Sequence, residues 1–380
     1  MKILVYGDIG GSGGYYNYCK GLFGSNSVPK DMNVSFVCNN KFKKKLGRLD
    51  ENVQIVTSNW IDSSSIVKRY IWHLWIYPNL VRKLKPDLEF YPSGQLRLFF
   101  RKALTLATCH NLLLFDDIEL KRIKKKKEKK YFNNSKIKQT NSFKKSNALI
   151  FLSEHSKEVV LPKIEENKFN KIIAHGLNKE FITTNQRDYA FGKQVNILYV
   201  SPVFHYKNHL SVVKAFQELK LESEFNIHLN FVGGGKSSAA DELTEYLKVN
   251  NLNDSITIKQ YLISSELVNE FETNDIFLFA SSCETFGITL LEAMGAKLPI
   301  ACSNRTGLPA ILKDAGVYFD PFNVSSIKTV LYELITNQDK RKELGSRGYL
   351  YAQEYTWKKC AEETFEFIKT IINNKNIKNV

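Results

Sequence analysis

Two carboxylates, Glu284 and Glu292, lie eight positions apart in the stretch 277–312. Within it, 277–280 is an apolar run typical of a buried parallel strand, and the apolar spacing over 289–296 predicts a helix. A helix start offers free N–H groups and a partial positive charge, which favour phosphate or an electron-rich sugar oxygen. An ionised Glu accepts hydrogen bonds only, which suits paired sugar hydroxyls. The stretch predicts a site for a phosphorylated sugar; the alternative makes Glu284 a helix cap and Glu292 a solvated helix residue.

The motifs of this stretch follow one another in a specific order. Glu-x7-Glu carries Phe-Gly behind its first Glu, and Glu-Ala-Met-Gly, a Pro-Ile-Ala strand and a Gly-Leu-Pro loop come next. This order resembles the nucleotide-sugar site of retaining glycosyltransferases of family 4, in the GT-B superfamily. The resemblance implies that Glu284 holds sugar hydroxyls and that Glu292 holds the ribose. It also implies donor contacts from the backbone of Thr285, Phe286 and Gly287.

A glycine-rich turn follows the first strand of the chain. KILVY at 2–6 predicts a buried strand, and GDIGGSGG at 7–14 leads into a predicted helix, which together form the first unit of a doubly wound sheet. The turn is neither a clean dinucleotide fingerprint nor a Walker loop. The resemblance implies that Gly10, Gly11 and Gly13 approach sugar or phosphate; tight-turn geometry alone is the alternative.

His110 follows the predicted strand 104–109, at the strand end where open α/β sheets bind ligands. The segment HNLLLFDD resembles the family segment in which a His approaches the donor sugar, so the resemblance implies that role for His110. A purely structural His is the alternative.

Lys207 lies in the turn PVFHYKNH at 202–209, which resembles the phosphate-binding turn of the family. The resemblance implies that Lys207 binds the diphosphate. Most members carry an Arg five residues before this Lys, and Pro202 stands there instead. The cations that could compensate are His205, His209 and Arg305. Gly233 follows the predicted strand 227–232 and lets the backbone come close to a ligand or turn sharply. The resemblance implies that the base of the nucleotide lies near Gly233.

The length of 380 residues exceeds the usual single domain, and 43% hydrophobic residues are enough for two cores. The resemblance implies an α/β protein of GT-B fold, with two Rossmann-like doubly wound domains facing an interdomain cleft. We expect an acceptor-side domain at 1–185, a donor-binding domain at 186–356, and a helix at 357–380 that crosses back to the first domain.

Within the first domain, the pattern of residues 66–84 predicts a helix. Its aromatic stripe of Tyr70, Trp72, Trp75 and Tyr77 favours core packing.

The formal net charge of +15 is concentrated in one segment. Residues 121–145 contain twelve Lys or Arg and one acid, which gives +11. One interpretation is a solvated helix. The other is that Lys124, Lys125, Lys126 and Lys127 dock on an anionic membrane surface or a phosphorylated acceptor. A nucleic-acid partner is not expected, because base-reading side chains are almost lacking among these charges.

Six cysteines are widely scattered with no Cys-x-x-Cys pair, which argues against a zinc site and a disulfide framework and favours a reducing cytoplasm. No apolar run approaches the length of about 20 residues that a membrane span needs. We therefore expect a cytoplasmic protein, with any membrane contact peripheral on the inner face.

The resemblance implies a retaining, metal-independent hexosyltransferase. Its co-substrate would be a UDP- or GDP-sugar with no further cofactor. Its acceptor would be a glycan, lipid-linked or part of a surface polysaccharide such as lipopolysaccharide, capsule or O-antigen. Two alternatives stay open: another GT-B enzyme, such as a sugar-nucleotide epimerase or a phosphorylase, and a non-catalytic polyanion-binding protein.

Overall fold

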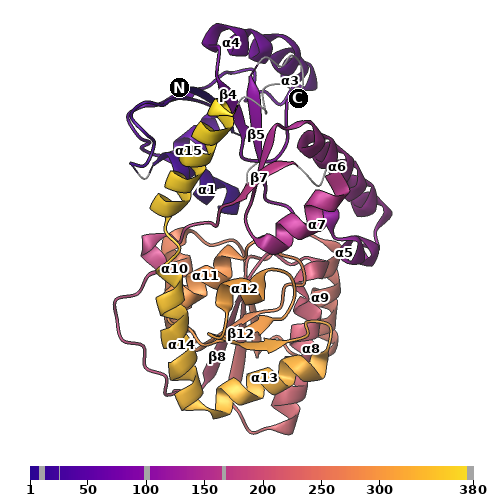
Figure 1. The fold of residues 1–380 in the computed structure, drawn as a ribbon. Coiled ribbons are helices and arrows are strands. Elements are labelled where there is room, and N and C mark those ends of the chain that lie inside the picture. Colours follow the sequence, from indigo (N-terminus) through magenta and orange to yellow (C-terminus); the bar gives the residue numbers. More distant parts are fainter. Residues whose placement is uncertain (8–12, 25, 98–102, 165–167, 375–380) are drawn as a thin grey trace. The chain divides into compact units, whose positions relative to one another are not determined.

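A computed structural model describes residues 1–7, 13–24, 26–97, 103–164 and 168–374 of the chain. They form two compact units, each with its own sheet (Figure 1). Unit 1 comprises Met1–Phe115, Asn133–Gly176 and Thr356–Val380, and unit 2 comprises Asp116–Phe132 and Leu177–Tyr355. The sequence places the domain boundaries near 185 and 356. In the structure the chain passes from one unit to the other after Gly176 and after Tyr355. The basic segment Asp116–Phe132 also belongs to unit 2.

Unit 1 is built on a seven-stranded sheet of order β3-β2-β1-β4-β5-β6-β7, in which neighbouring strands run parallel. Both faces of such a sheet are covered by helices, so its strands need apolar side chains on both sides. ALIF in β6 and LEFY in β4 are buried throughout, Glu89 included. The strands are β1 Lys2–Tyr6, β2 Asn33–Val37, β3 Val53–Val56, β4 Leu88–Tyr91, β5 Leu104–Cys109, β6 Ala148–Phe151 and β7 Phe169–Ile172.

The helices of unit 1 lie between these strands and at the end of the chain. They are α1 Gly13–Phe23, α2 Asn40–Leu46, α3 Ile66–Ile71, the π-helix η1 Trp72–Ile76, α4 Tyr77–Leu84, the 3-10 helix η2 Leu113–Phe115, α7 Glu154–Ile164 and α15 Trp357–Asn373. Helix α6, Lys126–Lys145, begins in unit 2 and continues into unit 1.

Helix α15 packs beside α1 in unit 1 (Figure 1). A Cβ on Gly21 would lie 2.2 Å from the Trp357 ring, so only glycine leaves room for this indole.

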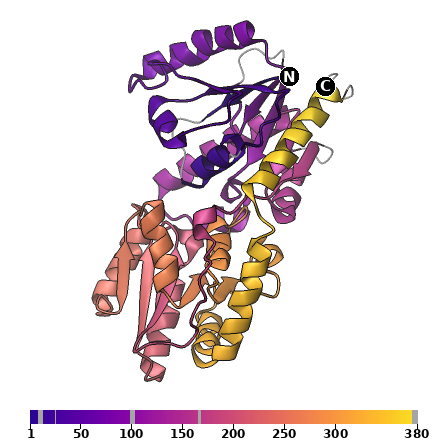
Figure 2. The ribbon, with the colours of Figure 1, turned by 90° about the vertical axis from the view of Figure 1, so that its left-hand side faces the viewer.

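The aromatic helix of unit 1 is continuous from α3 through η1 to α4 and runs along the outer edge of the unit (Figure 2). Trp72 and Tyr77 are buried, as the sequence predicts. For Tyr70 and Trp75 the core prediction is wrong, because they are 65% and 69% exposed. The backbone N–H of Tyr77 bonds to the carbonyl of Trp72, an i→i+5 bond that sets the π turn and returns Tyr77 to the core.

Unit 2 is built on a six-stranded parallel sheet of order β10-β9-β8-β11-β12-β13. Its strands are β8 Val195–Val200, β9 Ile227–Val232, β10 Ile256–Lys259, β11 Ile276–Phe279, β12 Ile300–Ser303 and β13 Val317–Phe319. Its helices are α5 Asp117–Arg122, α8 His209–Glu222, α9 Ser238–Val249, α10 Ser264–Thr273, α11 Ile288–Gly295, α12 Leu308–Leu312, α13 Val324–Thr336 and α14 Gln338–Ala352, with 3-10 turns η3 Lys179–Phe181 and η4 His205–Lys207.

The direction in which successive strands are added to this sheet reverses between the neighbours β8 and β11. Such a switch point is where open α/β sheets bind ligands.

Candidate active site

Lys207 and Glu284 meet at the switch point of unit 2. Lys207 ends η4, the turn that follows β8, and Glu284 lies in the loop that follows β11. The ammonium of Lys207 donates a hydrogen bond to Oε1 of Glu284, and the two side chains are only 10% and 15% exposed. Burial disfavours the charged ammonium, but the Glu284 carboxylate outweighs it, so the pKa of Lys207 lies above its ordinary value. The Lys207 side chain is therefore held in its charged form at neutral pH.

The loop of Glu284 runs directly into α11. Gly287 has φ 89°, a left-handed conformation that a side chain would strain, and it ends the loop at the N-terminus of the helix. Thr285 and Phe286 are buried, and the Phe286 ring lies 5.8 Å from that of Tyr355. The first N–H groups of a helix have no partner within the helix. The predicted residues Thr285, Phe286 and Gly287 thus bring backbone donors to the same end of the sheet as the ion pair.

Glu292 lies within α11 and is 4% exposed, so the interpretation as a solvated helix residue is wrong. Burial, and after it the charge of Glu180, raises the pKa of Glu292 to about 8. Among the described residues, its Oε2 has no hydrogen-bond partner. A buried carboxyl oxygen of this kind costs free energy unless something binds it, which favours a hydroxyl of a ligand.

Gly233 follows β9 and has φ 128°, and a Cβ there would lie 2.7 Å from the backbone of Ser201. The glycine is therefore needed for the close approach of the two turns after β8 and β9. His205, in the first of these turns, bonds through Nε2 to Oγ of Ser238 at 2.9 Å.

In unit 1, His110 follows β5 and packs edge-on against Tyr18, with ring centroids 4.7 Å apart. Burial lowers the pKa of His110 to about 3, so its imidazole is neutral at physiological pH. Gly13 is the first residue of α1, whereas the predicted contacts Gly10 and Gly11 lie outside the described residues.

The predicted docking lysines belong to unit 2, whereas the sequence places them in the first domain, 1–185. Lys124 and Lys125 form ion pairs with Glu242 and Asp241 of α9, at 3.5 and 3.0 Å. Lys126 and Lys127, the first residues of α6, are exposed. Because Lys124 and Lys125 are ion-paired, part of the positive charge predicted to dock on a membrane or an acceptor is already neutralised.

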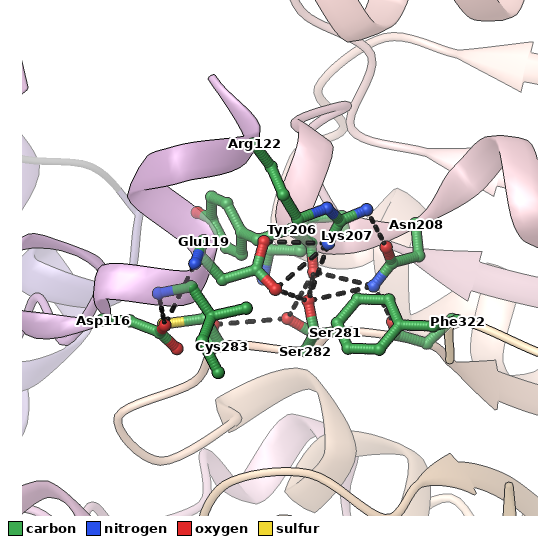
Figure 3. A network of polar contacts seen from close by, with 12 residues as sticks. Asp116, Glu119, Arg122, Tyr206, Lys207, Asn208, Ser281, Ser282, Cys283 and Phe322 are labelled. Atoms are coloured by element: carbon green, nitrogen blue, oxygen red, sulfur yellow. Dashed lines mark hydrogen bonds and ion pairs between the residues drawn. The ribbon is translucent and has the colours of Figure 1, made fainter. Parts of the chain in front are cut away.

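A buried polar network, which the sequence did not predict, connects α5 to the two turns of the ion pair (Figure 3). Glu119 of α5 is 3% exposed and accepts hydrogen bonds from Nη1 of Arg122 at 2.8 Å and from Oγ of Ser282 at 2.7 Å. Nη2 of Arg122 donates to Oδ1 of Asn208 at 2.8 Å. Asn208 follows Lys207 in the chain, and Ser282 precedes Glu284 by two positions. The only local signal is Glu-x-x-Arg, which reads as an ordinary pair on a solvated helix.

The cations considered as substitutes for an Arg at Pro202 differ in charge state. Burial, and then the charge of Lys207, lowers the pKa of His209 to about 3, so His209 is neutral and cannot compensate. Burial also lowers the pKa of His205. Arg305 lies with its guanidinium 5.5 Å from the centre of the Phe322 ring, and Arg122 lies 4.7 Å from that ring. Of the three predicted substitutes for this Arg, Arg305 is the one whose side chain carries a charge.

Many solved structures are similar to this chain in fold. Sucrose-phosphate synthase from Thermosynechococcus elongatus has a TM-score of 0.75 at 14% identity, covering 97% of this chain and 98% of that one. Anabaena Alr3699/HepE, solved in complex with UDP-glucose, has a TM-score of 0.75 at 14% identity, covering 97% and 100%. This chain has the GT-B fold. Likeness at this identity concerns the fold alone.

The part of the chain that carries Lys207 and Glu284 matches a family model. Residues 181–351 match the family model described as glycosyl transferases group 1. The O-antigen chain mannosyltransferase B of Escherichia coli is 26% identical over 183 residues, which is 48% of this chain and 48% of that protein. The chain matches about half the length of the curated relatives. The residues that match the family model, 181–351, lie within unit 2.

Two searches of the described residues gave no candidates. Within them, no group of three or more His, Cys, Asp or Glu side chains is placed to hold a metal ion. In the same part of the chain, no helix combines the length and the apolar character that crossing a membrane requires.

Proposed function

We propose that this protein is a retaining glycosyltransferase that transfers a sugar from a nucleotide-diphosphate donor to a glycan acceptor. The observation that carries the proposal is the Lys207–Glu284 pair at the switch point of unit 2, next to the N-terminus of α11. The match of residues 181–351 to group 1 glycosyltransferases supports it. A cation and helix amides suit a diphosphate, and a carboxylate suits sugar hydroxyls.

Donor binding would separate the ion pair. Without a ligand, Lys207 and Glu284 neutralise each other. We infer that the diphosphate takes over Lys207 and that the hydroxyls of the sugar take over Glu284, so that both charges stay compensated after the exchange. Glu292 would accept hydrogen bonds from the ribose hydroxyls through the carboxyl group whose Oε2 has no partner among the described residues. His110 is the candidate for a further contact to the sugar, as a neutral imidazole.

The chemical step then breaks the bond between the anomeric carbon and the diphosphate oxygen. Negative charge grows on the diphosphate while the sugar becomes oxocarbenium-like. Lys207 and the first amides of α11 stabilise the departing charge, which is the largest contribution that preorganised groups make to such a step. The acceptor hydroxyl forms the new bond on the same face and gives its proton to the departing diphosphate, so the configuration is retained. We propose no metal and no further cofactor for this step.

For the donor we propose a UDP- or GDP-sugar, and for the acceptor a lipid-linked or surface-polysaccharide glycan. The first rests on a GT-B relative solved with UDP-glucose, and the second on the relative named as an O-antigen chain mannosyltransferase. The test is a panel of UDP-, GDP- and dTDP-sugars, screened by thermal shift and then by turnover with and without acceptor glycans. Stabilisation by one nucleotide sugar and acceptor-dependent release of free nucleotide are expected. Nucleotide release without acceptor, or no donor binding, would contradict the proposal.

We further propose peripheral contact with an anionic membrane on the cytoplasmic side, made by the outer face of α3 and η1. Tyr70 and Trp75 share this face with Ile66, Val67 and Leu74, which are 64%, 66% and 42% exposed. Residues 63–86 contain no acid, and Lys68, Arg69, Arg82, Lys83 and Lys85 are all exposed. Aromatic and aliphatic side chains with flanking cations and no acids suit a negatively charged lipid surface.

Flotation with vesicles that contain anionic lipid tests this contact. Tyr70→Ala with Trp75→Ala should lower the bound fraction at least tenfold, whereas Leu350→Ala, which removes an apolar side chain 64% exposed on unit 2, should not. Neutralising Lys124, Lys125, Lys126 and Lys127 together should weaken binding less, since two of them are ion-paired. Equal binding of the aromatic double variant and wild type, or a dimer in solution that the double variant abolishes, would contradict membrane docking.

A further inference from the structure

The two turns that present Lys207 and Glu284 are irregular and need an external support. The first, residues 201–208, contains only the short η4, and the second, residues 280–287, contains no helix or strand. They are joined to each other through Asn208, whose Nδ2 donates to the carbonyl of Ala280 at 2.9 Å and lies 3.0 Å from Oγ of Ser282. The backbone N–H of Ser282 donates to the carbonyl of Tyr206 at 2.8 Å. Loops gain rigidity from such fixed polar contacts.

Helix α5 holds this junction from outside the two turns. Figure 3 shows Glu119 and Arg122 directed at Ser282 and Asn208, which are 163 and 86 positions away from them in the chain. Asp116 caps α5, because its Oδ1 accepts from the backbone N–H groups of Ile118 and Glu119 at 3.0 Å. The buried Glu119 carboxylate is paired with Arg122 and bonded to Ser282, so all members of the network depend on one another.

We infer that Glu119 and Arg122 are positioning residues that hold the Lys207 ammonium and the Glu284 carboxylate in place for the donor. The inference rests on the proposed function for its kinetic consequence. The guanidinium reaches Glu119 through Nη1 and Asn208 through Nη2, and only a planar fork can serve both at once. Asn208 has φ 54° at the N-terminus of α8, a conformation that nearby hydrogen bonds must maintain. Loss of the fork would release the residue next to Lys207 and the serine two positions before Glu284.

Hydrogen–deuterium exchange of the full chain tests the inference without any substrate. Arg122→Met should accelerate exchange at least fivefold in peptides covering 201–209 and 280–288, and leave the peptides of β9 and α13 unchanged. Lys121→Met, which removes a neighbouring exposed charge of α5, is the matched control and should leave all of these peptides at wild-type rates. If Arg122→Met fails to fold, Glu119→Gln serves in its place, since the amide keeps the volume of the carboxylate. Wild-type exchange in both turns of the folded variant would overturn the inference.

A second experiment measures steady-state kinetics with the donor that the panel of nucleotide sugars identifies. Arg122→Met should lower kcat at least tenfold while the donor KM changes less than threefold, and Arg122→Lys should restore part of the loss. A simply structural role would lower the active fraction and leave kcat per active site unchanged, and this outcome would overturn the inference. If the wild type transfers no sugar, the proposed function fails, whereas the exchange experiment still decides whether α5 supports the two turns.

Discussion

The ammonium of Lys207 is bonded to the carboxylate of Glu284, which lies 77 positions later in the chain. Removing one partner of a buried ion pair leaves an uncompensated charge and costs about 3–5 kcal/mol. Lys207→Met and Glu284→Gln should therefore each lower the free energy of unfolding. The double variant should cost clearly less than the sum of the two, because it leaves no unpaired charge. Chemical denaturation of the four proteins measures this cycle.

The same variants separate stability from activity. Lys207→Met should lower turnover at least tenfold, about 1.4 kcal/mol, because the departing diphosphate loses its cation. Glu284→Gln should lower it as well. The double variant should regain stability relative to Lys207→Met but regain no turnover. Full activity of Lys207→Met would refute its assignment to the diphosphate, and additive losses of stability would refute the coupling of the pair.

Glu292 should make the folded state less stable as the pH rises. Its pKa is about 8 in the folded chain against 4.5 for an ordinary Glu, so between these values the folded state keeps a proton that the unfolded chain has released. The free energy of unfolding should fall by about 1.4 kcal/mol per pH unit from this group alone. Glu292→Gln should remove this contribution, so the difference in stability between variant and wild type should grow between pH 6 and pH 8. Urea unfolding at these pH values measures it.

Proton release on donor binding tests the proposed ribose role of Glu292. If the ribose hydroxyls donate to an ionised carboxylate, binding at pH 7 should release a proton from Glu292. Calorimetric titration in buffers of different ionisation enthalpy detects such a release, and Glu292→Gln should abolish it. Equal donor affinity of Glu292→Gln and wild type would show that the carboxyl group does not hold the ribose.

Local sequence patterns were sufficient for much of unit 2. The apolar run of β11 and the helix of Glu292 follow from residue types and spacing, and the order of motifs resembles a known site. The positions of Lys207 and Glu284 after β8 and β11 then bring them together, because parallel strands end at the same edge. The burial of Glu292 could not be predicted from the sequence. The periodicity of apolar residues shows which of them share one face of the helix, but not which other elements cover that face.

Two further features depend on tertiary contacts that no local pattern records. Tyr70 and Trp75 occur in a helical aromatic stripe, and the π turn of η1 decides which of its rings face the core. Helix α5 belongs to unit 2 although the chain before and after Asp116–Phe132 belongs to unit 1. A charged segment looks the same in sequence whether it is solvated or paired with another element, as Lys125 is with Asp241.

His209 should destabilise the folded chain in acid. Its ring stacks on Tyr199 with centroids 4.6 Å apart, and burial, followed by the charge of Lys207, lowers its pKa to about 3. Between about pH 6.5 and pH 3 the unfolded chain binds a proton here that the folded chain does not, so stability falls as the pH falls. His209→Phe keeps the stacked ring and removes the titration. Below pH 6.5 its unfolding free energy should decline less steeply than that of the wild type, by about 1.4 kcal/mol per pH unit.

Urea unfolding of His209→Phe and wild type at pH 7, 6 and 5 measures the difference in slope. His110 and His175 are buried with lowered pKa values as well, so the variant should keep part of the acid sensitivity. Parallel stability curves for the two proteins would mean that His209 does not contribute to it.

Pro202 stands where the resemblance implies an Arg, which would be a second cation for the proposed diphosphate. It is exposed two positions after the end of β8 and five positions before Lys207, and its ring offers neither charge nor N–H to a ligand. Pro202→Arg should increase donor affinity about tenfold, because a charged hydrogen bond to a phosphate contributes about 1.5–3 kcal/mol and part of it is lost to screening. The gain should shrink as salt is raised. Pro202→Ala is the control for loss of the ring, and the affinities are measured by calorimetry with the donor that the panel identifies. Equal affinity of Pro202→Arg and Pro202→Ala would mean that Lys207 and the amides of α11 already neutralise the diphosphate, or that Arg305 supplies the second charge.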